Sequence, residues 1–199
     1  SMAFKYAVAL TGGIATGKTT IAKLFFQDRF KIIDADRVAH QMLDRYALDV
    51  AKIFGDEILD EYGKVDRAKL GAIVFADEDK KDELEDLLHP PIREEIMIMA
   101  DELDKEIRPY IVDIPLFFEG SGYDIDKVIV VYVPQELQLQ RIMARDNLTK
   151  DQAMQRINSQ LPIDHKKPLA TYLIDNSLDM NNLVSEYSKV RDQIIGEFI

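Results

Sequence analysis

The chain has no cysteine among its 199 residues. This absence excludes disulfide bonds, thiolate metal sites and cysteine nucleophiles, and it is typical of proteins that work in a reducing compartment. The sequence also has no run of the roughly 18 consecutive apolar residues that a membrane-spanning helix requires. We therefore expect a cytoplasmic protein that has no membrane partner.

Positive charge is scarce, since the formal net charge is −11. Residues 40–108 hold 20 acidic and 10 basic side chains, which accounts for most of the imbalance. Such a surface repels nucleic-acid phosphates, so we expect no nucleic-acid partner. An anionic small molecule would have to be held by local basic groups, and residues 141–167 carry six Lys and Arg against three Asp.

Short apolar runs alternate with segments of helical periodicity, which is typical of an α/β protein with a doubly wound parallel sheet. We predict five strands, at residues 6–10, 31–34, 110–114, 128–133 and 172–174, and helices from Lys18 to about Phe30 and over residues 183–198. Residues 38–108 are rich in helix formers and poor in strand signals. We therefore predict a core of residues 1–37 and 109–199 that carries an inserted helical lobe at 38–108.

Residues Gly12–Thr19 match the phosphate-binding loop pattern GxxxxGK[ST] between a predicted strand and a predicted helix. Glycines allow such a loop to turn its N–H groups inward at a helix N-terminus, where the helix dipole also favours an anion. Lys18 would reach the β- and γ-phosphates of a nucleotide, and the Thr19 hydroxyl would be placed to bind Mg²⁺. The alternative, a glycine-rich turn without a ligand, is disfavoured by this strand–loop–helix context.

Two carboxylates, Asp34 and Asp36, follow the second predicted strand. In an extended segment they would point the same way, toward the crevice beyond the strand end where ligands bind in such sheets. One could accept the proton of an attacking hydroxyl group, and the other could help to hold Mg²⁺ through water. The alternative is that one of them caps the following helix.

Two arginines on a predicted helix form a third candidate, and two weaker candidates follow. Arg141 and Arg145 would share one face of a helix and could neutralise charge during phosphoryl transfer, or they could lie on a solvated face with Arg145 paired to a carboxylate. His89 could contact a substrate, although a histidine before proline is more often found in a turn or at a helix end. Asp113 ends the third strand and could assist Mg²⁺ or accept a structural hydrogen bond.

An ordered set of motifs resembles the dephospho-CoA kinase family along nearly the whole chain. The set comprises residues 9–14 with 17–19, 33–36, 88–90, 113–119, 140–141 with 145–146, Arg156 with Gln160, and 174–176. The resemblance implies a nucleoside-monophosphate-kinase-like, three-layer P-loop fold with a five-stranded parallel sheet, a helical lobe for the CoA precursor and a mobile lid at about 141–167. It also implies phosphorylation of the ribose 3′-hydroxyl of dephospho-CoA by ATP, the last step of CoA synthesis. We expect a monomer or weak oligomer.

The resemblance also implies roles for individual residues. Asp36 is the expected general base, Lys18, Arg141 and Arg145 are expected to assist catalysis, and Asp34 and His89 line the acceptor side. ATP is expected to contact the phosphate-binding loop and one residue near adenine: Gly12, Gly13, Ile14, Ala15, Thr16, Gly17, Lys18, Thr19, Thr20 and Asn176. The chain departs from the family pattern at Ala15, where glycine is common, at Thr171, where Asp is common, and after Asn176, where glycine is common.

Two other functions remain open from the residues alone. Another P-loop kinase, acting on a nucleoside, nucleotide or sugar, would need the same loop and could use the same helical insert. A nucleotide-binding switch fits less well, because the chain has no Asn-Lys-x-Asp sequence for reading guanine and its one Asp-x-x-Gly, at Asp60–Gly63, falls in the insert. A carboxylate beside the loop favours transfer to a hydroxyl group over hydrolysis by a positioned water.

Overall fold

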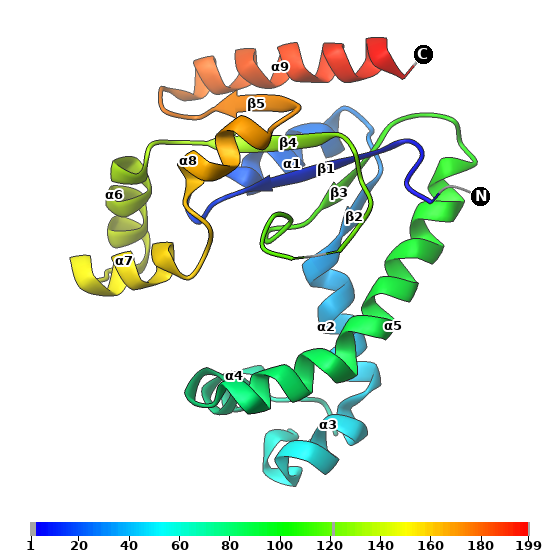
Figure 1. Cartoon of the computed structure of the whole chain (residues 1–199), viewed down its shortest axis with the longest axis vertical. Coiled ribbons are helices and arrows are strands. Elements are labelled where there is room, and N and C mark those ends of the chain that lie inside the picture. The colour runs from blue at the N-terminus through cyan, green and yellow to red at the C-terminus, as the bar shows by residue number, and fades with distance from the viewer. Residues whose placement is uncertain (1–2, 121, 199) are drawn as a thin grey trace. The chain divides into compact units, whose positions relative to one another are not determined.

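The computed structural model describes residues 3–120 and 122–198, which form two compact units (Figure 1). The first unit contains the chain up to Asp34 and from Ala100 onward, and the second contains Ala35–Met99. No helix in the described part of the chain is both long and apolar enough to cross a membrane.

The first unit is built on a five-stranded, entirely parallel sheet, which confirms the predicted fold class. The strand order is β2-β3-β1-β4-β5, so β1 lies in the centre between β3 and β4. All residues of β1, β3 and β4 are buried, as expected of strands that are covered on both faces. The strands are β1 Ala7–Gly12, β2 Ile32–Asp34, β3 Tyr110–Asp113, β4 Val128–Tyr132 and β5 Tyr172–Asp175.

Five α-helices accompany this sheet: α1 Lys18–Gln27, α6 Gln135–Asp146, α7 Lys150–Asn158, α8 Ile163–Lys166 and α9 Met180–Glu197, with a 3₁₀ turn η2 at Lys167–Leu169. The prediction that the first helix reaches about Phe30 is wrong. Arg29 adopts a left-handed conformation with φ of 66°, which ends the helix. The Phe30 N–H then bonds to the Phe25 carbonyl at 3.0 Å, and the Phe30 side chain enters the core.

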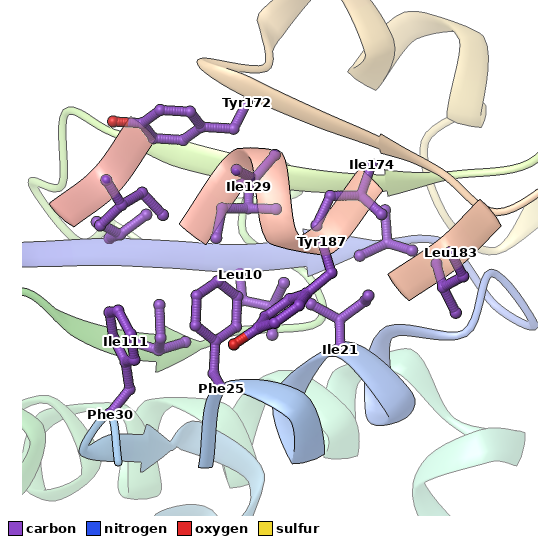
Figure 2. Close-up of a cluster of buried hydrophobic side chains, with 14 residues drawn as sticks. Leu10, Ile21, Phe25, Phe30, Ile111, Ile129, Tyr172, Ile174, Leu183 and Tyr187 are labelled. Atoms are coloured by element: carbon purple, nitrogen blue, oxygen red, sulfur yellow. The ribbon is translucent and has the colours of Figure 1, made fainter. Parts of the chain in front are cut away.

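Helices α1 and α9 cover one face of the sheet and form its main hydrophobic core (Figure 2). The ring of Phe25 on α1 meets Phe30 and Tyr187 edge-on, with centroids 4.9 and 4.8 Å apart. The Tyr187 hydroxyl, on α9, donates to the Asp28 carboxylate at 2.5 Å and to the Leu24 carbonyl at 3.0 Å. Burial and the hydrogen bond to Asp28 both raise the pKa of Tyr187, so the phenol stays protonated at neutral pH.

The second unit is helical, with α2 Ala35–Arg45, α3 Ala47–Phe54, η1 Asp56–Ile58, α4 Arg67–Ala76 and most of α5 Glu78–Asp104. It has its own hydrophobic cluster, whose members include Val50, Phe54 and Ile58. Helix α5 runs through Pro90 and Pro91. Placing His89 in a turn or at a helix end is therefore wrong. The backbone hydrogen bonds of the 27-residue helix stabilise it by more than is lost through the two N–H donors that the prolines lack.

Candidate active site

The loop between β1 and α1 has the form of an anion-binding nest. Gly17 precedes α1 with φ of 93°, and Ala15 is also left-handed with φ of 61°. Alternating handedness of this kind turns successive N–H groups toward one point. Within the described residues, no hydrogen-bond partner is found for the backbone N–H groups of Ala15, Gly17, Lys18 and Thr19. Four unsatisfied donors at a helix N-terminus match the requirements of a phosphate group.

Neighbouring backbone and side chains fit closely around the loop glycines. A β-carbon on Gly12 would lie 2.7 Å from Thr16 Oγ1 and 2.9 Å from the Val131 carbonyl oxygen. One on Gly17 would lie 2.3 Å from Nδ2 of Asn176. The glycines of the motif are thus required by close packing as well as by backbone conformation.

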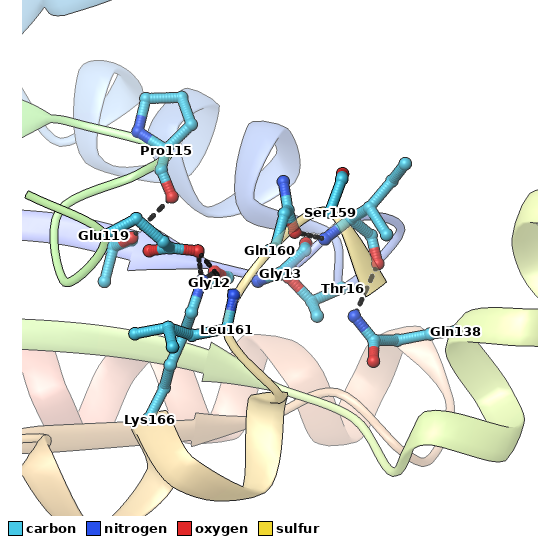
Figure 3. Close-up of polar contacts among 12 residues, drawn as sticks. Gly12, Gly13, Thr16, Pro115, Glu119, Gln138, Ser159, Gln160, Leu161 and Lys166 are labelled. Carbon is cyan, nitrogen blue, oxygen red and sulfur yellow. Dashed lines mark hydrogen bonds and ion pairs between the residues drawn. The ribbon is translucent and has the colours of Figure 1, made fainter. Parts of the chain in front are cut away.

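The loop carbonyls are held from outside by side chains that are distant in sequence (Figure 3). Lys166 donates to the Gly12 carbonyl at 2.8 Å, and Gln138 donates to the Ile14 carbonyl at 2.9 Å. Asn176 donates to the Thr16 carbonyl at 2.9 Å. In addition, the Ile14 N–H donates to Oε1 of Gln160 at 2.9 Å. No role was expected for Lys166, Gln138 or Gln160. The basic stretch contains Lys166 and the family motif contains Gln160, but no signal in the sequence pointed to Gln138.

Lys18 forms an ion pair with Asp113, and both side chains are largely buried. Asp113 is the last residue of β3, and in the strand register it lies opposite Asp34, the last residue of β2. The sheet therefore brings Lys18, Asp34 and Asp113 to the carboxyl ends of adjacent strands. In a parallel sheet this edge is the place where ligands bind.

Asp36 lies in the first turn of α2, because that helix begins at Ala35. The expectation that Asp34 and Asp36 share one side of an extended segment is therefore wrong. The negative charge of Asp36 is favourable at the N-terminus of a helix, which explains why this segment coils directly after the strand. Asp36 and His89 both belong to the second unit, and His89 lies exposed on α5.

The two arginines of α6 have different partners. Arg141 donates to the backbone carbonyl of Asn176 at 2.8 Å, so it lies next to a residue that also contacts the loop. Arg145 instead pairs with Asp146 at 3.0 Å, and Arg156 on α7 pairs with the same carboxylate at 2.8 Å. The hydrogen bond from Arg145 is the main cause that lowers the pKa of Asp146. In this conformation Arg141 is near the loop, whereas Arg156 joins α7 to α6 through Asp146, the carboxylate that Arg145 also contacts.

No cluster of three or more metal-binding side chains is found within residues 3–120 and 122–198. Mg²⁺ nonetheless does not require one, since it is commonly held by one or two protein groups, phosphate oxygens and water. The Thr19 side chain is exposed in the first turn of α1, and Asp113 and Asp34 supply carboxylates at the neighbouring strand ends. The oxygen ligands available at this edge therefore suit Mg²⁺.

Comparison with known proteins identifies the family of this chain. A model of the dephospho-CoA kinase family matches residues 6–182. A dephospho-CoA kinase from Sulfurimonas denitrificans is 46% identical over 198 residues, covering 100% of this chain and 98% of the relative. The solved dephospho-CoA kinase from Campylobacter jejuni aligns with a TM-score of 0.80 at 40% identity, covering 98% of this chain and 99% of the other. A shikimate kinase from Acinetobacter baumannii, with a TM-score of 0.50 at 17% identity, shares the fold alone. The chain belongs to the dephospho-CoA kinase family.

Proposed function

We propose that this chain transfers the γ-phosphoryl group of ATP to the ribose 3′-hydroxyl of dephospho-CoA, giving CoA and ADP. The observation that carries the proposal is the nest of N–H groups beside Lys18 that have no partner among the described residues, in a chain of this family. The nest accounts for phosphate binding, and the family relationship supports the identity of the acceptor. Other acceptors would use the same donor site.

ATP would place its β- and γ-phosphates on the loop from Gly12 to Thr20. Lys18 would exchange its partner Asp113 for phosphate oxygens, which carry more negative charge than one carboxylate. Asn176 would act on ATP through the loop backbone that it holds, in addition to any contact near adenine. Arg141, which already lies beside Asn176, would add positive charge as the phosphoryl group moves.

Mg²⁺ would be held by the Thr19 hydroxyl, with Asp34 or Asp113 helping through water. When bound, the ion would neutralise charge on the β- and γ-phosphates. Asp113 pairs with Lys18 in this structure, which places its carboxylate next to the lysine that would contact the phosphates. The chain's own contribution here is the placement of one hydroxyl and two carboxylates at one edge of the sheet.

Asp36 would take the proton from the 3′-hydroxyl as it attacks the γ-phosphorus. Only one residue separates Asp36 from Asp34, so the covalent chain keeps the two Cα atoms within about 7 Å of each other. The helical unit that begins at Ala35, including His89, would bind the rest of the CoA precursor. Helices α6 and α7, with Arg145, would form the lid over ATP.

An acceptor panel tests the reaction directly. ATP consumption by the wild-type chain should be fast with dephospho-CoA and near background with adenosine, AMP and gluconate. Turnover of another acceptor alone would refute the proposed substrate and leave the donor site standing.

Two variants test the assigned roles. Asp36→Asn should lower kcat by about 10²–10⁴-fold, the usual contribution of a general base, while the KM for ATP changes little. Activity within a few-fold of wild type would rule out this base. Lys18→Ala should weaken ATP binding and also lower kcat, since Lys18 would contact the phosphates in both the ground and transition states; unchanged ATP affinity would contradict the assignment of the loop.

A further inference from the structure

Lys166, the last residue of α8, is a lysine whose side chain is fully buried, with 0% exposure. Its Nζ donates to the carbonyl oxygen of Gly12 at 2.8 Å and pairs with Oε2 of Glu119 at 2.7 Å (Figure 3). Glu119 belongs to the segment that follows β3. A single ammonium group thus joins three segments: the phosphate-binding loop, the segment after β3 and helix α8.

The buried Lys166–Glu119 pair is expected to contribute little to the stability of the fold. Removing an ammonium and a carboxylate group from water has a large free-energy cost, which an ion pair repays only when all remaining polar atoms are satisfied. Glu119 does not meet that condition, because its Oε1 is buried and has no hydrogen-bond partner in the described part of the chain. A costly buried pair that contacts the phosphate-binding loop suggests a functional reason for its presence.

The contact with Gly12 restrains a peptide that the loop itself holds only through the long hydrogen bond from the Gly13 N–H to Thr16 Oγ1, at 3.4 Å. Gly12 and Gly13 have no side chains to restrict their backbone, and glycine is the most flexible residue. In a trans peptide the carbonyl and the following N–H point in opposite directions. Holding the Gly12 carbonyl therefore fixes the orientation of the whole peptide between Gly12 and Gly13, at the point where β1 ends and the loop begins.

The same contact also docks the chain between α7 and α8 onto the loop. Within that stretch, Gln160 accepts a hydrogen bond from the Ile14 N–H at 2.9 Å, and the Leu161 N–H donates to Glu119 at 3.1 Å. Lys166 then reaches Gly12. Two of these contacts, through Gln160 and Lys166, hold this connection against the first half of the loop, and the third holds it to Glu119.

We propose that Lys166 is a positioning residue for the nucleotide, which it serves by fixing the Gly12 carbonyl, while Glu119 holds Lys166 and the α7–α8 connection in place. The proposal rests on the proposed ATP site but requires no particular acceptor. Lys166 acts through the loop backbone and needs no contact with the phosphates. Its loss should therefore appear as weaker nucleotide binding, with little change in the KM for dephospho-CoA.

The experiment compares four variants: Lys166→Met, Lys166→Arg, the double variant Lys166→Met/Glu119→Gln, and the control Lys167→Met. The control removes a neighbouring, exposed lysine from the same turn. Two quantities are measured for each variant: the Kd for ADP and ATP by calorimetry, and the urea midpoint of unfolding. Steady-state kinetics add the KM values for ATP and dephospho-CoA.

Lys166→Met leaves a buried carboxylate without its cation, so it should lower the urea midpoint and raise the nucleotide Kd at least 10-fold. The double variant removes both charges and keeps an acceptor for the Leu161 N–H, so its midpoint should return toward wild type while the Kd stays at least 10-fold raised. Lys166→Arg keeps the charge and a donor, and it should recover a large part of the affinity. Lys167→Met should bind nucleotide like wild type.

A double variant with restored stability and a nucleotide Kd within two-fold of wild type would overturn the proposal, because Lys166 would then serve only the fold. Affinity that falls only in proportion to the folded fraction in every variant would overturn it as well. If Lys166→Met does not fold, the double variant and Lys166→Arg carry the same comparison. Failure of the proposed reaction would appear instead in the acceptor panel with the wild-type chain, which leaves the nucleotide Kd values unaffected.

Discussion

Replacing Gly17 with alanine tests whether the loop geometry limits both stability and nucleotide binding. Gly17 stands directly before α1 with φ of 93° and ψ of 21°, in the left-handed region that disfavours residues with a β-carbon. The added carbon would also lie 2.3 Å from Nδ2 of Asn176, which donates to the Thr16 carbonyl. The variant therefore strains the backbone and displaces a hydrogen-bonded side chain.

The two effects can be estimated separately. A left-handed conformation costs a residue other than glycine about 1–2 kcal/mol. Displacing Asn176 forfeits one hydrogen bond, which is worth about 1 kcal/mol. We expect Gly17→Ala to lower the free energy of unfolding by about 2–3 kcal/mol, which corresponds to roughly 5–10 °C in Tm for a chain of this size.

Urea denaturation at pH 7 measures the loss, and Gly196→Ala serves as the control. Gly196 lies in α9 with nothing within 4 Å of its would-be β-carbon, so alanine there should be neutral or stabilising. When Asn176 is already alanine, the added β-carbon displaces no hydrogen-bonded side chain. Gly17→Ala should then lower the free energy of unfolding by about 1 kcal/mol less than it does in the wild-type chain. A harmless Gly17→Ala variant, or strict additivity with Asn176→Ala, would refute this reasoning.

Three further predictions concern side-chain hydrogen bonds of the first unit. Tyr187→Phe keeps the ring packing but removes the hydroxyl bonded to Asp28, and it should cost about 1 kcal/mol in urea denaturation at pH 7. The hydrogen bond from that hydroxyl is the main cause that lowers the pKa of Asp28. The free energy of unfolding that Tyr187→Phe loses should therefore be fully present above about pH 4 and shrink as the pH falls further. A loss that grows in acid would contradict this sign. Arg145→Met should raise the pKa of Asp146, as followed by carboxyl NMR, with Arg156 holding part of the shift; an unchanged pKa would show that Arg145 does not pair with this carboxylate in solution.

The fold could be predicted because its signals are local. The apolar run at Val128–Tyr132 and the strand–loop–helix context of Gly12–Thr19 each identify one element of a parallel sheet, and the family resemblance is confirmed by the comparisons. The errors occurred where one backbone conformation decides the outcome. The left-handed φ of Arg29 ends α1 early, and α2 begins at Ala35 without an extended residue after Asp34. The periodicity of apolar residues in the sequence does not indicate either helix boundary.

The interior of the site was harder to predict because its contacts are long-range. Lys18 and Asp113 were each candidates from their own motifs, but no sequence pattern indicates that they pair across 95 residues, as they do in the structure. Likewise, Gln138 and Lys166 are ordinary helix residues in sequence, and nothing in their spacing shows that both donate to loop carbonyls. Charge counting did identify the basic stretch that contains Lys166, but a charge count carries no information on burial, and this lysine is fully buried.

These long-range donors follow one physical rule. Gln138 binds the Ile14 carbonyl and Asn176 binds the Thr16 carbonyl, both from outside the loop. Because each peptide is trans, the next N–H, at Ala15 and at Gly17, must point the opposite way, toward the nest. A loop whose carbonyls were free could rotate them inward and repel phosphate. The inward orientation of these loop N–H groups therefore depends on amide donors located more than 120 residues away, as much as on the loop's own glycines.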